Sequence, residues 1–335
     1  MRRTLMEPKT SQLPHKPVED ETPLYNQEFL DFLSGLPKER VIEKFESYQY
    51  QGFWYNPPLL HGIFNMQKHF QPCENDIFLV TAPKSGTTWL KAMIYALMNR
   101  KAYPPQSPHH PLLNNTPHQL VPFLEFINPS KYGSVCNSPD RTTRILATHC
   151  PLISLPKSIT DDASPCKIVY LCRDVKDNFV SLFHFAQKNQ WHISLEDSFE
   201  LYCKGFSGAG PVWDQISGYW KESLDRPHKV LFMRYEEMQN EPQFQLKRLA
   251  HFLGKPISEE DEKSGVVDQI INLCSFDTQS RLKVNNTGDL VCGLSNSSFF
   301  RKGVVGDWKN RLTIDMASKL DQITEEKFHA FGLSI

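Results

Sequence analysis

The sequence predicts an α/β protein with a central parallel sheet that is flanked by helices on both faces. Four short apolar runs have the composition of buried strands, and segments with helical periodicity separate them. No internal repeat and no clean domain boundary is visible in the 335 residues. We therefore expect residues 23–335 to form one domain. Residues 1–22, with three prolines among charged residues, are expected to form a disordered tail.

The first predicted strand and the loop after it are the most informative stretch. Residues 77–80 are apolar, Pro83 and Gly86 interrupt the run, and helical spacing begins at Leu90. A helix that starts at such a loop directs unpaired backbone N–H groups and the positive end of its dipole at the loop. The junction therefore favours phosphate binding, with Lys84 as a point charge. A plain turn with a surface lysine is the alternative.

The composition of this loop argues against an ordinary Mg-NTP site. The pattern G-x-x-x-x-G-K-[ST] is not matched, since the first glycine is absent and Lys84 precedes Gly86. Gly86 permits close approach of the backbone to an oxyanion, and Thr87 and Thr88 can add hydroxyl donors.

The second predicted strand, residues 144–148, ends at His149. Ligands of open parallel sheets lie beyond the carboxyl ends of the strands, and imidazole titrates near neutral pH. His149 can therefore accept a proton from a hydroxyl, although a structural histidine is the alternative. Before this strand, residues 103–140 form a long connection rich in proline and asparagine. It is either a lid over an apolar substrate or a plain excursion.

The third predicted strand, residues 167–172, is followed at once by Arg173. A guanidinium at the end of a strand suits bidentate phosphate binding, and an ion pair with Asp174 or Asp177 is the alternative. The fourth strand, residues 230–233, ends close to Tyr235. Helices are predicted around residues 30–33 and at 59–70, 90–98, 174–184, 195–206, 212–224, 244–253, 266–273 and 314–331.

Two adjacent cations, Arg301 and Lys302, precede Gly303 in a glycine-containing segment near the end of the chain. They are either a second phosphate clamp or a solvated basic turn. The net charge is −1, so no global basic field indicates nucleic acid or an anionic membrane. The eight cysteines include no C-x-x-C pair, and no apolar run approaches ~18 residues. Without a signal peptide, the chain is expected to be cytoplasmic with reduced thiols.

Three motifs, in this order, resemble the plant cytosolic sulfotransferases that use 3′-phosphoadenosine 5′-phosphosulfate (PAPS). PKSGTTW at residues 83–89 resembles the 5′-phosphosulfate loop of that family, and IVYLCRDVKDNFVSLFHF at 168–185 resembles its 3′-phosphate segment. RKGVVGDWKN at 301–310 resembles its closing G-x-x-G-x-x-K motif. The resemblance extends over about residues 48–331 and implies one domain of the P-loop-kinase-like fold.

The resemblance also implies roles for individual residues. His149 would be the general base, and Lys84 would meet the charge that grows on the leaving oxygen. Trp89 would stack on adenine, while Tyr235 and Ser275 reach it. The residues implied to bind the donor are Lys84, Ser85, Gly86, Thr87, Thr88, Trp89, Arg173, Ser181, Tyr235, Ser275, Arg301, Lys302 and Gly303.

The implied reaction is sulfuryl transfer from PAPS to a hydroxyl of a small hydrophobic acceptor, such as a flavonoid, a steroid or a similar plant metabolite. No metal is expected, because a sulfuryl group carries less charge than a phosphoryl group. The chain is expected to be a monomer or a weak homodimer. A nucleotide kinase and a nucleotide-binding regulatory protein of the same fold without turnover are the alternatives.

Three positions depart from the family pattern. Ala147 replaces a lysine that is common two residues before the catalytic histidine, so one cation near the sulfonate is missing. Asp174 replaces a common asparagine and places a carboxylate beside Arg173, where it could weaken phosphate binding. Ser318 replaces the glutamate of the dimer motif K-x-x-x-T-V-x-x-x-E.

Overall fold

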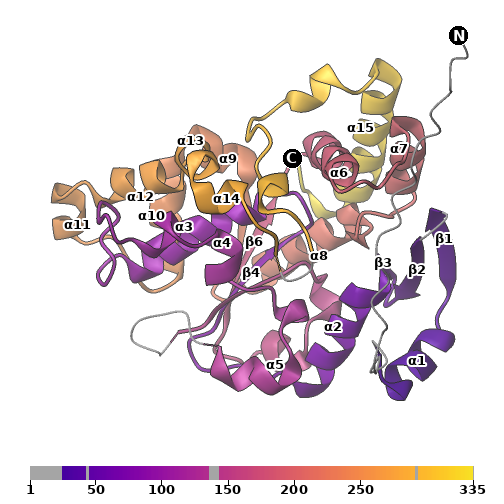
Figure 1. The fold of residues 1–335 in the computed structure, drawn as a ribbon, viewed down its shortest axis with the longest axis horizontal. Coiled ribbons are helices and arrows are strands. Elements are labelled where there is room, and N and C mark those ends of the chain that lie inside the picture. The colour runs from indigo at the N-terminus through magenta and orange to yellow at the C-terminus, as the bar shows by residue number, and fades with distance from the viewer. Residues whose placement is uncertain (1–24, 43–44, 136–142, 291–292, 335) are drawn as a thin grey trace, which may run out of the picture. The chain divides into compact units, whose positions relative to one another are not determined.

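A computed structural model describes residues 25–42, 45–135, 143–290 and 293–334 of the chain (Figure 1). The predicted disordered tail, residues 1–22, lies outside the described residues, and the domain boundary at residue 23 stays a prediction. By its contacts the chain divides into two units, residues 1–35 and 36–335. The first contains helix α1 (Gln27–Ser34), which begins where the Asn26 side chain accepts a hydrogen bond from the Phe29 N–H.

The second unit is built on a sheet of four parallel strands in the order β5-β4-β6-β8. These are the four strands that the apolar runs predict, and each is buried over almost its whole length. Val80 pairs with both Thr148 and Tyr170, so the carboxyl ends of the strands lie at one edge. The bounds are β4 (Ile77–Thr81), β5 (Ile145–Thr148), β6 (Lys167–Cys172) and β8 (Val230–Arg234).

Helices cover both faces of this sheet, as predicted (Figure 1). Because side chains alternate along a strand, one set faces each way. Leu79, Ala147 and Leu171 share a buried cluster with residues of α3 (Thr87–Asn99), α10 (Pro242–Phe252) and α12 (Val266–Cys274). On the opposite face, the ring of Tyr170 stacks on that of Tyr219 in α8 (Val212–Asp225), with 4.3 Å between the ring centroids.

A second, antiparallel sheet was not predicted from the sequence. Its order is β1-β2-β3-β7, and it comprises β1 (Lys38–Ile42), β2 (Phe45–Tyr50), β3 (Phe53–Tyr55) and β7 (Ala209–Gly210). Strands β2 and β3 form a hairpin whose two turn residues, Gln51 and Gly52, both have positive φ angles of 52° and 84°. Turns of this kind match the twist of paired strands.

The remaining elements are mostly short and connect the strands. The α-helices are α2 (Pro57–His69), α4 (Pro117–Leu120), α5 (Lys157–Thr160), α6 (Val175–Lys188), α7 (Leu195–Cys203), α9 (Tyr235–Asn240), α11 (Glu259–Lys263), α13 (Phe276–Arg281), α14 (Lys283–Asn286) and α15 (Ile314–Phe328). The 3₁₀ helices are η1 (Pro111–Leu113), η2 (Leu124–Phe126), η3 (Pro129–Ser134), η4 (Leu152–Ser154), η5 (Asn296–Phe299), η6 (Asp307–Asn310) and η7 (His329–Phe331).

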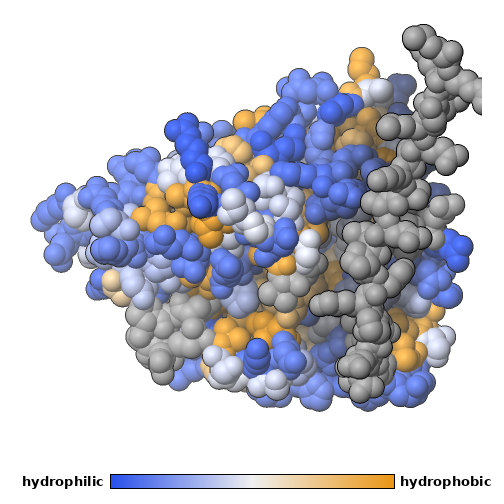
Figure 2. Space-filling model, in the orientation of Figure 1, coloured by the Kyte–Doolittle hydropathy of each residue, from blue (hydrophilic) through white to orange (hydrophobic). Residues whose placement is uncertain are grey.

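The surface mixes polar and apolar side chains. On the face seen in Figure 2, hydrophilic residues surround smaller hydrophobic areas. Phe126 and the two valines of the third motif, Val304 and Val305, are exposed although they are apolar. Within the described ranges, every helix is too short or too polar to cross a bilayer.

Candidate active site

The loop after β4 has the conformation that the first motif requires. Lys84 and Gly86 have positive φ angles of 70° and 102°, and α3 begins at Thr87 without a side-chain cap. The first N–H groups of α3 therefore lack intrahelical partners and face the loop. A Cβ atom on Gly86 would lie 2.7 Å from the ring of Tyr235, so only glycine fits here. Asn178 of α6 holds the loop by donating to the Pro83 carbonyl, at 2.7 Å.

The ammonium group of Lys84 lies in a cluster of cations. Its Nζ atom is 4.1 Å from the ring centroid of Phe185 and 5.5 Å from that of Phe299. Burial, together with the positive charges of Arg173, Arg301 and Lys188, lowers the pKa of Lys84 to about 7. The three motifs thus bring their cations within electrostatic reach of one another.

Arg173, at the end of β6, is buried and holds parts of the other two motifs. It donates to the Val304 carbonyl at 2.8 Å and makes a long contact of 3.5 Å with the Lys84 carbonyl. Its guanidinium lies 3.7 Å from the Asp177 carboxylate, whereas Asp174 caps α6 and pairs with Lys176. The Nε atom of Arg173 is buried without a hydrogen-bond acceptor among the described residues.

The third motif is fixed by two buried carboxylates. Asp307 accepts hydrogen bonds from Arg301 and, at 2.6 Å, from Lys302, and these two cations help to hold its pKa well below the usual range. Asp177 of α6 accepts from the backbone N–H groups of Gly306 and Trp308, at 2.6 and 2.9 Å. The segment is therefore bound to the helix that follows Arg173.

Tyr235, the first residue of α9, contacts all three motifs. Its hydroxyl donates to the Gly303 carbonyl at 3.0 Å, and the Arg173 guanidinium lies 4.6 Å above its ring. The Trp89 ring meets it edge-on at 5.4 Å, and Gly86 lies against its ring. Tyr235 thus joins elements that are far apart in the sequence.

The structure leaves two implied donor-binding serines without direct contact to this cluster. Ser181 is buried in α6, and its hydroxyl has no hydrogen bond within the part of the chain that the structure describes. Ser275 caps α13, where its hydroxyl oxygen accepts from the Thr278 N–H at 3.2 Å. The next residue, Phe276, lies where a Cβ atom on Gly303 would clash, so Ser275 is near the third motif.

His149 lies beside the loop of the first motif. Its Nδ1 atom is 2.8 Å from the carbonyl oxygen of Thr81, the last residue of β4, and 3.3 Å from the hydroxyl of the same residue. A carbonyl only accepts, so Nδ1 carries the hydrogen and Nε2 of the neutral ring is a free base. Burial lowers the pKa of His149 to about 4, and the charges of Lys91 and Lys84 act in the same direction, opposed by the bond to Thr81.

Two residues of the connection before β5 also contact His149. The Glu125 carboxylate accepts from the backbone N–H of His149 at 2.9 Å, and the Phe123 ring lies 4.6 Å from the imidazole. Helix α2 approaches Glu125 at Gly62, where a Cβ atom would lie 1.9 Å from the Glu125 carbonyl oxygen. Phe123 and Glu125 of the connection 103–140 are therefore packed against His149, and residues 136–142 lie outside the described part.

The residues of this cluster fit a ligand with two anionic ends. The uncapped start of α3 and the buried, unpaired Nε atoms of Arg173 and Arg301 all offer donors without acceptors. Lys84 and both arginines lie in one cluster, with His149 next to the loop. The arrangement therefore fits a nucleotide with separate phosphate groups. Residues that hold this arrangement and that the sequence analysis did not identify are Thr81, Lys91, His118, Glu125, Asn178 and Asp307.

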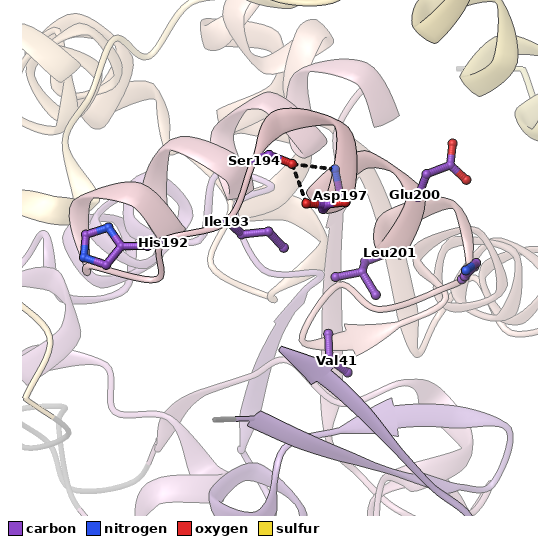
Figure 3. Close-up of a pocket in the computed structure, with 8 residues that line it drawn as sticks. Val41, His192, Ile193, Ser194, Asp197, Glu200 and Leu201 are labelled. Atoms are coloured by element: carbon purple, nitrogen blue, oxygen red, sulfur yellow. Dashed lines mark hydrogen bonds between the residues drawn. The ribbon is translucent and has the colours of Figure 1, made fainter. Parts of the chain in front are cut away.

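A separate cavity of about 330 Å³ lies between β1 and the segment around α7 (Figure 3). Its lining is mixed, and Figure 3 shows Ser194 bonded to Asp197 at the start of α7. None of the residues that line it belongs to the donor cluster: Val41, His192, Ile193, Ser194, Asp197, Glu200, Leu201 and Lys204.

A family model described as a sulfotransferase domain matches residues 74–332. Cytosolic sulfotransferase 6 of Arabidopsis thaliana is 45% identical over 319 residues, which cover 92% of this chain and 95% of that protein. Cytosolic sulfotransferase 13 of the same plant is 45% identical over 305 residues, which cover 90% of this chain and 91% of that protein. The chain belongs to the plant cytosolic sulfotransferase family.

Solved structures support the assignment of this chain to the sulfotransferase family. A sulphotransferase from Arabidopsis thaliana is 38% identical with a TM-score of 0.73, and the match covers 94% of this chain and 100% of that chain. A mouse sulfotransferase complexed with PAP is 27% identical with a TM-score of 0.66, covering 84% of this chain and 94% of that chain. The P-loop-kinase-like fold that the resemblance implies is thereby confirmed. The protein is a sulfotransferase enzyme, and the predicted metal independence stays a prediction.

Proposed function

We propose that this sulfotransferase transfers a sulfuryl group from PAPS to a hydroxyl of a small hydrophobic acceptor, with His149 as the general base. The acceptor would be a flavonoid, a steroid or a similar plant metabolite. The observation that supports this most directly is the bond from His149 Nδ1 to the Thr81 carbonyl, at 2.8 Å. That bond leaves Nε2 as a proton acceptor beside the loop that ends β4.

The donor is assigned to the cation cluster. The N–H groups of the first turn of α3 and the Lys84 ammonium would hold the 5′-phosphosulfate, while Arg173 and Arg301 would hold the 3′-phosphate. The unpaired Nε atoms of the two arginines support this assignment. PAP bound to the mouse relative supports the same nucleotide class. The other proposed donor-binding residues are Ser85, Gly86, Thr87, Thr88, Trp89, Ser181, Tyr235, Ser275, Lys302 and Gly303.

In the proposed reaction His149 Nε2 takes the proton of the acceptor hydroxyl as the acceptor oxygen forms its bond to sulfur. The bond from sulfur to the bridging phosphate oxygen breaks, and the Lys84 ammonium compensates the negative charge on that oxygen. A neutral imidazole is required at the start, and the low pKa of His149 provides it at neutral pH. The anionic donor raises this pKa, so that His149 becomes a stronger base when the donor is bound.

Apolar groups around His149 favour a hydrophobic acceptor. Phe123 lies against the imidazole, and Phe126, which is 51% exposed, lies at 6.0 Å from Phe123. Phe185 lies against Lys84, with its ring centroid 4.1 Å from Nζ. An acceptor whose hydroxyl reaches His149 would therefore place its ring against apolar side chains such as Phe123. Apolar pockets discriminate weakly between scaffolds, at ~1–3 kcal/mol per methylene group, so several acceptors are expected.

The test is transfer of radiolabelled sulfate from PAPS to a panel of phenols, flavonoids and sterols. Labelled product is expected from the wild-type protein without added metal and in the presence of a chelator. His149→Ala should lower kcat by about 10²–10⁴-fold while PAP still binds, because only the base is lost. The absence of product with every acceptor, together with unimpaired PAP binding, would instead favour a nucleotide-binding protein. A His149→Ala variant with near wild-type kcat would remove His149 from the mechanism.

A further inference from the structure

Lys91 is a fully buried cation that the proposed reaction does not use. It is the fifth residue of α3, and its side chain is shielded from solvent. Its Nζ atom lies 3.2 Å from Nδ1 of His118 and 3.3 Å from the ring centroid of Phe123. Within the part of the chain that the structure describes, no carboxylate lies within ion-pair distance of it. Burying a lysine in this way is costly, so its position calls for an explanation.

A chain of hydrogen bonds runs from Lys91 to the donor loop. His118 is also buried, and its Nε2 atom lies 3.0 Å from the hydroxyl oxygen of Thr88 in the first turn of α3. An ammonium group only donates, so Nδ1 of a neutral His118 accepts from Lys91 and the ring carries its hydrogen at Nε2. Nε2 then donates to the Thr88 oxygen. The hydrogen of the Thr88 hydroxyl is left to point at a ligand.

Burial lowers the pKa of Lys91 well below its usual value, and two contacts oppose this effect and favour the ammonium form. The face of the Phe123 ring attracts a cation at this distance, and the buried carboxylate of Glu125 attracts it from farther away. His118 is held neutral by burial and by the neighbouring charges, which lower its pKa well below the usual value. With Lys91 as the ammonium ion, the direction of both hydrogen bonds is determined.

Lys91 approaches the reacting groups from the face on which Ala147 lies. Ala147 belongs to the same buried cluster as Leu90 and Met93 of α3, and its backbone pairs with Phe123. Residues two apart on a strand point to the same side, so position 147 and His149 share a face. The Phe123 ring contacts both groups: its centroid lies 3.3 Å from the Lys91 Nζ atom and 4.6 Å from the imidazole centroid of His149. The helix therefore places the Lys91 ammonium against Phe123, the residue whose backbone pairs with Ala147.

We propose that Lys91 is a positioning residue for sulfuryl transfer, which acts through His118 to direct the Thr88 hydroxyl hydrogen at the sulfuryl group of the donor. The inference rests on the proposed donor site, because Thr88 is one of its residues. Lys91 itself touches neither donor nor acceptor. Its effect is therefore transmitted by the orientation of a hydroxyl, and it should disappear when that hydroxyl is removed.

A double-mutant cycle between Lys91 and Thr88 tests this dependence. Lys91→Met and Thr88→Val keep the size of each side chain and remove its polar group. Each single variant should lower kcat/KM for PAPS by about 10–100-fold, as expected for a hydrogen bond to a charged group in the transition state. The double variant should be no slower than Thr88→Val alone. Equal losses that multiply in the double variant would overturn the proposal, and so would a Lys91→Met variant with wild-type kinetics.

Two further variants separate positioning from a purely structural role. Lys229 is also a buried lysine, and it donates to the backbone carbonyls of Asp161 and Ser164, so Lys229→Met is the control. It should lower thermal stability without any coupling to Thr88→Val. His118→Gln retains an amide donor for Thr88 and an acceptor for Lys91, whereas His118→Leu retains neither. The proposal expects His118→Gln to recover most of the kcat that His118→Leu loses, and equal losses in both would overturn it.

Failure of the proposed function and failure of the proposed role of Lys91 give different results. If the wild-type protein sulfates an acceptor but the cycle is additive, only the role of Lys91 is wrong. If the wild-type protein transfers no sulfate from PAPS to any acceptor, the proposed transferase function is wrong, and the role of Lys91 in sulfuryl transfer is overturned with it.

Discussion

His149 and Thr81 are joined by a hydrogen bond of 2.8 Å from the imidazole Nδ1 to the backbone carbonyl. Thr81 is the last residue of the strand that carries the donor loop, and its hydroxyl also bonds to that of Thr87 at 2.6 Å, where α3 begins. The proposed base is therefore oriented by the same strand that positions the phosphosulfate. Any shift of the carboxyl end of β4 would therefore move both the loop and the imidazole.

We predict that His149 in the ligand-free protein titrates far below an ordinary histidine, with a pKa of about 4, because burial disfavours the imidazolium. The ring is then neutral at pH 7 and gains a proton only as the pH falls towards 4. Bound PAP should raise this pKa, since its negative charges favour the cation. NMR titration checks both statements, with the His149 signals assigned by their absence in His149→Ala. A ligand-free pKa near 6.5 would contradict the buried, bonded imidazole.

Binding of PAP should become weaker as the pH rises above 7. Burial and the nearby cations lower the pKa of free Lys84 to about 7, and a bound polyanion raises it again. Above pH 7 binding must therefore take up a proton, and affinity falls by up to about tenfold per pH unit. Calorimetry in buffers of different ionisation enthalpy measures this uptake. In Lys84→Arg, which stays charged, the dependence should be flatter, and equal slopes in both proteins would contradict the assignment.

Two carboxylates on α6 should respond differently to the same substitution. Asp177→Asn places an amide where the backbone N–H groups of Gly306 and Trp308 both need an acceptor. Loss of such charged bonds costs about 1.5–3 kcal/mol, so the PAP dissociation constant should rise about tenfold or more. Asp174→Asn is the matched control, because asparagine caps a helix as well as aspartate does. Calorimetry should show unchanged or tighter PAP binding for it, and equal effects of the two variants would refute the proposed anchoring role of Asp177.

Gly62 and Gly218 lie within helices but should tolerate alanine very differently. A Cβ atom on Gly62 would lie 1.9 Å from the Glu125 carbonyl oxygen, whereas one on Gly218 meets nothing within 4 Å. Gly62→Ala should therefore destabilise the protein by about 1–3 kcal/mol, move Glu125 away from His149 and lower kcat. Gly218→Ala should raise stability by up to about 1 kcal/mol through helix propensity. Denaturant unfolding and initial rates check both, and a neutral Gly62→Ala would show that α2 does not position Glu125.

The parallel sheet and the positions of the donor residues were predictable because they depend on local patterns. Four apolar runs, each followed by a polar residue with distinctive chemistry, indicate strands whose carboxyl ends meet. His149 and Arg173 were singled out in this way, Tyr235 was implied by the family resemblance, and the structure brings these residues into one region. The helix after the first loop was equally predictable from the spacing of Leu90, Met93 and Leu97.

Contacts between distant parts of the chain were not predictable from one sequence. The bonds from Asp177 to Gly306 and Trp308 link an ordinary helical acid to a loop with no complementary pattern. Glu125 bonds to a backbone N–H, which has no sequence signature at all. The antiparallel sheet was missed because Gln51 occupies a turn position that more often holds asparagine or aspartate.

The contacts of Tyr235 have a consequence for exchanging segments between related proteins. Its hydroxyl, its ring face and its ring edge each contact a different motif. Gly86 lies against the ring, and the carbonyl of Gly303 accepts the hydrogen bond from the hydroxyl. A chimera that imports one motif alone would therefore mismatch the side chain at the shared junction. Donor preference in this scaffold can be redesigned only by transplanting the three segments together with the tyrosine between them.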